Sequence, residues 1–140
     1  TLYASFAWND AEMTAVANDI FQPANIAPAG STLAFSPDLQ YVLRGRYTWQ
    51  VADYEWHAQV ALQHADESEN SLVLSQQANI PSWDTVDATL GFRKESYGVE
   101  IFAENLTDER VIRFIKNNGA TPEYFVTRPT TIGLRFTYNY

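Results

Sequence analysis

Cysteine is absent from the 140 residues, which excludes a disulfide framework and any metal site built from thiolates. Positive charge is scarce, with 9 Lys and Arg against 17 Asp and Glu and a net charge of −8. Because phosphate binding needs clustered Lys and Arg, nucleic acid is not expected as a partner. The chain has no run of about 18 apolar residues, so no transmembrane helix is predicted. It also lacks an initiator Met and a leader, so we interpret it as a mature piece or an excised fragment.

Aromatic residues are abundant at 14 % of the chain, and they favour strands over helices. Apolar and polar residues alternate with period 2 in six stretches, while no helical period is found. Each stretch has one apolar face free of formal charge and an opposite face rich in Arg, Glu, Asp, Gln and Thr. The sequence therefore predicts an all-β fold with six strands, at residues 2–9, 39–50, 54–63, 86–93, 99–104 and 131–140.

The connections between the predicted strands alternate in length. Long segments occupy residues 10–37, 65–82 and 108–128, and short ones occupy only 51–53 and 94–98. Loops longer than about 12–15 residues are uncommon in compact domains. Because every second connection is long, all the long ones fall at one edge of an antiparallel up-and-down meander, as in outer-membrane barrels.

The aromatic residues of the apolar faces gather near the short-turn edge, and aliphatic residues fill the middle of the strands. The rings at the short-turn edge are Tyr47, Trp49, Tyr54, Trp56, Phe92, Tyr138 and Tyr140. Trp8 and Tyr41 lie nearer the long-loop edge. Aromatic residues at the strand ends, with aliphatic residues between them, are typical of a β-barrel in a lipid bilayer. One alternative is a soluble all-β binding module, a small barrel or sandwich with these faces inside. Another is an eight-stranded barrel that lacks its first hairpin.

Motifs near the end of the chain resemble a known family. The stretch "VEIFAENLTDERV", followed by "RPTTIGLRFTYNY", resembles the carboxy-terminal strands of TonB-dependent outer-membrane receptors. "GSTLAFSPDLQYVLRGRYTW" and "IPSWDTVDATLGF" are similar to earlier strands of that family. "TIGLRFTY" also fits the final-strand signal of outer-membrane proteins. The matching family residues are Asn105, Leu106, Thr107, Asp108, Arg128 and Pro129, and the final-strand residues are Thr131, Gly133, Phe136, Tyr138 and the terminal Tyr140.

The resemblance implies that residues 1–140 are the last six strands of a barrel with about 22 strands, without its plug and earlier strands. Such a receptor lies in the bacterial outer membrane. It imports scarce ligands such as ferric siderophores, cobalamin or glycans, and the TonB system powers it through the plug. Its partners include outer-membrane lipid and the barrel assembly machinery, which reads the final strand. Ligand contacts are expected from the three long loops.

We expect the remaining polar residues to have structural roles. Asn105 and Asp108 are expected to end a strand and shape the next loop through side-chain bonds to the backbone. Charges of the polar faces are expected to form cross-strand ladders: Arg44, Arg46, Glu55, Asp87, Arg93, Glu100, Glu104 and Arg135. His57 and His64 fall on opposite faces of one strand. We predict no enzyme activity, cofactor or metal site, and we expect the isolated chain to self-associate through open edges and its apolar face.

Overall fold

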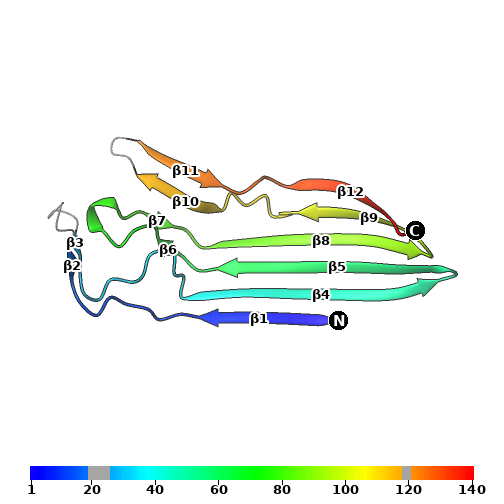
Figure 1. Ribbon diagram of the computed structural model, residues 1–140, viewed down its shortest axis with the longest axis horizontal. Coiled ribbons are helices and arrows are strands. Elements are labelled where there is room, and N and C mark those ends of the chain that lie inside the picture. Colours follow the sequence, from blue (N-terminus) through cyan, green and yellow to red (C-terminus); the bar gives the residue numbers. More distant parts are fainter. Residues whose placement is uncertain (19–25, 118–120) are drawn as a thin grey trace.

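The computed structural model describes residues 1–18, 26–117 and 121–140. Its long strands form one antiparallel sheet in the order β1-β4-β5-β8-β9-β12 (Figure 1). These strands are β1 (Leu2–Trp8), β4 (Leu39–Val51), β5 (Tyr54–Ala65), β8 (Trp83–Lys94), β9 (Tyr97–Glu104) and β12 (Thr131–Tyr138). Each strand pairs with the next long strand along the chain, so the predicted six-stranded up-and-down meander is confirmed. Parts of the predicted loops 10–37 and 108–128 lie outside the described residues.

Strand bounds differ from the predicted ones mainly at the ends. β8 begins three residues early at Trp83, and β5 runs on to Ala65. The expectation that the last strand continues to Tyr140 is wrong, because β12 ends at Tyr138. Its partner β9 begins only at Tyr97, opposite Tyr138, so no partner strand lies beyond that pair.

Short turns join the strands at one end of the sheet, as predicted, but each has only two residues where the segments 51–53 and 94–98 were expected. Ala52 and Asp53 connect β4 to β5, and Glu95 and Ser96 connect β8 to β9. The first residue of each turn has a left-handed backbone, with φ of 53° at Ala52 and 48° at Glu95. Two-residue hairpin turns favour this region because it matches the twist of the flanking strands.

The long connections contain short antiparallel ribbons, all at the end opposite the two-residue turns (Figure 1). They are β2 (Ala17–Asn18) with β3 (Ile26–Ala27), β6 (Ser68–Glu69) with β7 (Asn79–Ile80), and β10 (Ile112–Asn117) with β11 (Pro122–Val126). A single 3₁₀ turn, η1 (Leu74–Gln76), lies between β6 and β7. The sequence predicted only loops here, so the β10–β11 hairpin was missed.

Strand register gathers the predicted apolar faces into one continuous surface. Leu43 of β4 lies opposite Leu62 of β5. Leu90 of β8 lies opposite Ile101 of β9, which in turn lies opposite Leu134 of β12. The predicted assignment of residues to the two faces is therefore confirmed across the sheet. We call these surfaces the apolar face and the polar face.

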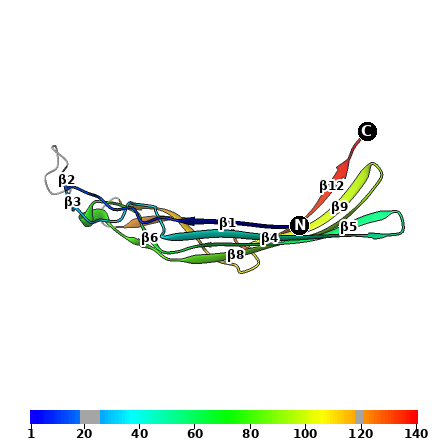
Figure 2. The same cartoon turned by 90° about the horizontal axis from the view of Figure 1, so that it is seen from below.

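The apolar face of the sheet is open to solvent, unlike that of a soluble sheet. The sheet is a single layer that bends upward at β9 and β12 (Figure 2). On the apolar face, Val60 is 53 % and Leu134 76 % exposed. Buried sheet residues such as Ala61 and Thr85 lie instead on the polar face, toward the long connections. Within the described ranges, the strands thus form an open layer and neither a sandwich nor a closed barrel.

Candidate functional site

An aromatic row crosses the apolar face at the short-turn end. Neighbouring ring centroids lie 5.1–6.3 Å apart along Tyr47, Trp49, Trp56 and Phe92, and Phe92 also lies 5.4 Å from Tyr54 and 6.5 Å from Tyr97. Four of these rings, Trp49, Tyr54, Trp56 and Phe92, are the predicted interface aromatics, and the structure brings them together. Tyr97 was missed because the predicted strand began two residues later. At the turns, the ammonium group of Lys94 lies 4.9 Å from the centre of the Tyr54 ring.

A second group of rings lies on the same face near the long connections. Phe6 and Tyr41 have centroids 6.0 Å apart, and Tyr41 stacks on His64 at 4.8 Å. Tyr41 and Trp49 are eight residues apart on β4, which corresponds to roughly 27 Å along the strand. If the strand is tilted by about 40° from the barrel axis, the two residues lie roughly 20 Å apart along that axis, close to the ~25 Å height of the apolar band in outer-membrane barrels.

A charged row crosses the polar face at right angles to the strands. Register places His57, Gly91, Glu100 and Arg135 side by side on β5, β8, β9 and β12. His57 Nε2 lies 3.0 Å from Glu100 Oε2, and the Arg135 guanidinium donates to the other carboxylate oxygen. The predicted charge ladder is thus present at Glu100 and Arg135.

Gly91 makes this charged row possible. A Cβ atom there would lie 2.8 Å from His57 Cε1 and 2.7 Å from the carbonyl oxygen of Val99. Both distances are shorter than real Cβ contacts, so a side chain at this position would displace the imidazole. The glycine leaves the gap through which His57 reaches Glu100, two strands away.

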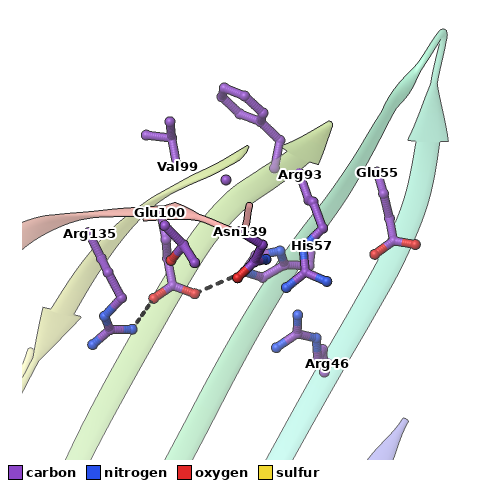
Figure 3. Close-up of a pocket in the computed structure, with 11 residues that line it drawn as sticks. Arg46, Glu55, His57, Arg93, Val99, Glu100, Arg135 and Asn139 are labelled. Carbon is purple, nitrogen blue, oxygen red and sulfur yellow. Dashed lines mark hydrogen bonds and ion pairs between the residues drawn. The ribbon is translucent and has the colours of Figure 1, made fainter. Parts of the chain in front are cut away.

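A concave pocket of about 290 Å³ lies beside this row on the polar face (Figure 3). Its charged lining comprises Arg46, Glu55, His57, Arg93, Glu100 and Arg135. Among the described residues, Arg46 and Arg93 form no ion pair within 4.0 Å. The predicted charge ladder is therefore wrong for these two arginines: Arg46 lies opposite the uncharged Gln59, and Glu55, opposite Arg93 in register, forms no ion pair with it.

Asn105 joins the end of β9 to the segment that leads into β12. Its side-chain amide donates to the carbonyl oxygens of Glu109 and Arg128, both at 2.9 Å. Its amide oxygen accepts from the Glu109 backbone and from the Thr107 hydroxyl. The residue is 8 % exposed and has a left-handed φ of 54°. The prediction that Asn105 shapes the loop is confirmed.

Other motif residues extend this cluster to neighbouring strands. The Asp87 carboxylate of β8 accepts from the Asn105 backbone N–H at 2.9 Å. The single proton of the Thr107 hydroxyl is shared between the Asn105 amide oxygen and the Asp84 carbonyl oxygen, each 3.1 Å away. Asp108 accepts from the Thr130 backbone N–H at 3.1 Å, next to Pro129. Leu106 is exposed, but its N–H donates to the Val86 carbonyl oxygen at 2.7 Å. The "NLTD" motif thus holds β8, β9 and β12 together at the long-connection end.

On the final strand, Gly133 accommodates the ring of Phe102. A Cβ atom at Gly133 would clash with the ring atoms of Phe102 on the neighbouring strand β9. The Arg135 guanidinium lies 5.2 Å from the centre of the same ring. Phe136 and Tyr138, the two aromatics of the predicted signal, are 68 % and 61 % exposed on the apolar face. Within the part of the chain that the structure describes, β12 pairs only with β9, and its other edge is open.

The three predicted recognition loops contact one another. Phe35 of the first loop stacks on Phe114 of the third, with centroids 5.8 Å apart. The Asn70 side chain of the second loop donates to the Ile115 carbonyl oxygen of the third at 3.3 Å. Arg113 extends over the ring of Trp83 at 4.6 Å. The described parts of these loops therefore form one connected cluster at the end of the sheet.

No protein-family model matches the chain, and no curated protein or solved structure matches it. Over the described ranges there is no helix of sufficient length and apolar character to cross a membrane. The same residues hold no cluster of three or more His, Asp or Glu side chains arranged to bind a metal ion.

Proposed function

We propose that the chain is the carboxy-terminal wall segment of a TonB-dependent outer-membrane receptor. The exposure of the apolar face carries this proposal: its side chains are open to solvent, and the few buried residues of the sheet lie on the polar face. In water, an exposed apolar surface of this extent is unfavourable. Against lipid it is favourable, and the aromatic groups at both ends of an aliphatic band suit the two membrane interfaces.

Sheet topology supports a place in a larger barrel. The two-residue turns lie at one end and the long connections at the other, as periplasmic turns and extracellular loops do in outer-membrane barrels. Among the residues that the structure describes, β1 and β12 each have one open edge, which a neighbouring strand of the same wall would pair. In such a barrel of about 22 strands, the polar face would line the lumen.

The transport role follows from the family resemblance. We assign to the parent receptor the uptake of a scarce ligand of the ferric siderophore, cobalamin or glycan class. The long connections 10–37, 65–82 and 108–128 form the ligand-facing surface, because loops on a rigid wall usually carry recognition. The assembly machinery would read β12 through Gly133, Phe136 and Tyr138.

Single-tryptophan variants test the membrane orientation. Trp56 lies on the apolar face and Trp83 on the polar face. In vesicles whose acyl chains carry bromine, a quencher confined to the lipid, the variant that keeps only Trp56 should lose fluorescence. The variant that keeps only Trp83 should retain it. Equal fluorescence of both variants, with the chain in the aqueous fraction, would favour a soluble binding module.

Loop deletions test the transport role. In cells that carry the full receptor, deletion of residues 65–82 should reduce uptake of the imported ligand without lowering the amount of receptor in the outer membrane. Ferric siderophores, cobalamin and glycans are supplied in turn, with and without an active TonB system. Uptake that is independent of TonB, or that is unchanged by deletion of each long loop, would contradict the proposal.

A further inference from the structure

We infer that the pocket on the polar face binds a carboxylate group, held by the guanidinium groups of Arg46 and Arg93. The pocket lies near the short-turn end, away from the predicted recognition loops. This site lies on the polar face alone, so its chemistry does not depend on whether the apolar face meets lipid.

The lining has the opposite charge to the chain as a whole. Three Arg against two Glu give it one net positive charge with His57 neutral, in a chain of net charge −8. A monoanion such as a carboxylate neutralises this charge, whereas a phosphate dianion exceeds it. The charge balance therefore favours a single carboxylate.

Among the described residues, the glutamates that line the pocket form no ion pair with Arg46 or Arg93. Glu100 uses one carboxylate oxygen for His57 and the other for Arg135. In Figure 3 the side chains of Arg46 and Arg93 extend toward the same space from β4 and β8. Each guanidinium presents N–H donors in a planar arrangement that matches a carboxylate.

Pocket size restricts the ligand. A volume of about 290 Å³ lies at the lower end of the range for small-molecule sites. It fits a small free carboxylate or the end of an Asp or Glu side chain. Both sources present the same group to the two arginines.

The test follows the side-chain Nε–Hε NMR signals of arginine in the full chain in detergent micelles. Each signal is assigned by its loss in the matching Arg→Gln variant. The probes are acetate, a short peptide with one Glu, the same peptide with Gln in its place, and inorganic phosphate. We expect saturable shifts of the Arg46 and Arg93 signals with a carboxylate probe. A response to acetate identifies a free ligand, and a response to the Glu peptide alone identifies a polypeptide ligand.

Three variants separate a specific site from general attraction. Arg93→Gln should weaken binding by about tenfold, through loss of charge-assisted hydrogen bonds. Arg46→Lys should also weaken it, because lysine keeps the charge but loses the planar pair of donors. Arg44→Gln is the matched control, since Arg44 is on the same strand and face but outside the pocket. Equal weakening by Arg44→Gln, no shift with either carboxylate, or tighter binding of phosphate would overturn the inference.

Discussion

Replacement of Asn105 by alanine should strongly destabilise the sheet at its long-connection end. The change removes four side-chain hydrogen bonds, to Glu109, Arg128 and Thr107. Each such bond contributes about 0.5–1.5 kcal/mol net. A left-handed backbone costs alanine about 1 kcal/mol more. We therefore expect Asn105→Ala to lower the free energy of unfolding by about 3–7 kcal/mol.

Glycine at the same position separates the two contributions. Asn105→Gly loses the same hydrogen bonds but accepts the φ of 54° without strain. It should therefore be about 1 kcal/mol more stable than Asn105→Ala. The matched control is Asn79→Ala, because the exposed Asn79 makes a single side-chain bond, to Glu67 at 3.0 Å. That variant should change stability by less than about 0.5 kcal/mol.

The measurement is urea unfolding of the chain in detergent micelles, followed by the fluorescence of its 4 tryptophans. Trp83 adjoins Asp84, whose carbonyl oxygen binds Thr107, so its fluorescence should respond to loss of the cluster. If Asn105→Ala costs less than about 1 kcal/mol, the hydrogen bonds are not the source of stability that we infer. Equal stability of the alanine and glycine variants would refute the assigned strain.

Three further substitutions test the sheet itself. Gly91→Ala should lower the urea midpoint by more than a surface change does, because its Cβ would meet backbone at 2.7 Å. Gly133→Ala should lower the free energy of unfolding of the native chain but not that of the Phe102→Ala variant, which lacks the clashing ring. Equal losses in the native chain and in the variant would exclude the contact between Gly133 and the Phe102 ring. Leu90→Arg should reduce the free energy of insertion into vesicles by about 2–4 kcal/mol. The adjacent residue Thr89 lies on the polar face, and Thr89→Arg should change the free energy of insertion by less than about 1 kcal/mol. Similar losses of insertion free energy for the two variants would argue against a lipid-facing apolar face.

The alternation of apolar and polar residues predicted the strands of the sheet wherever one face of a strand was uniformly apolar and the other uniformly polar. It failed at the start of β8, because Asp84 lies on the apolar face. There the Asp84 carboxylate binds His64 Nδ1 at 2.9 Å, and this pair interrupts the apolar pattern on both strands. The sequence could not reveal that partner, since the two residues lie on strands joined by a long connection.

The β10–β11 hairpin was missed for a different reason. Its register shifts between Ile112 and Phe114, so the apolar residues do not keep a period of 2. Ile115 then follows Phe114 directly, and the pattern has the appearance of an irregular loop. Alternation is informative only while both strands remain in register.

The polar-face site depends on register between distant strands, which the sequence does not determine. His57 and Glu100 are 43 residues apart, and one long connection and one two-residue turn between them decide whether they meet. The sequence placed both residues on the correct face. It did not show that Gly91 lies between them, or that Arg46 and Arg93 would lack acidic partners among the described residues.

The alternation of short turns and long connections also orders the folding of the sheet. The β4–β5 and β8–β9 hairpins close over two residues each, and hairpins of this kind form in about 1–10 μs. The other three strand pairs must first close the connections 9–38, 66–82 and 105–130, which costs chain entropy before any contact is gained. The two hairpins should therefore form early. The outer strands β1 and β12 should pair later, which leaves the carboxy-terminal strand available to another chain until assembly is complete.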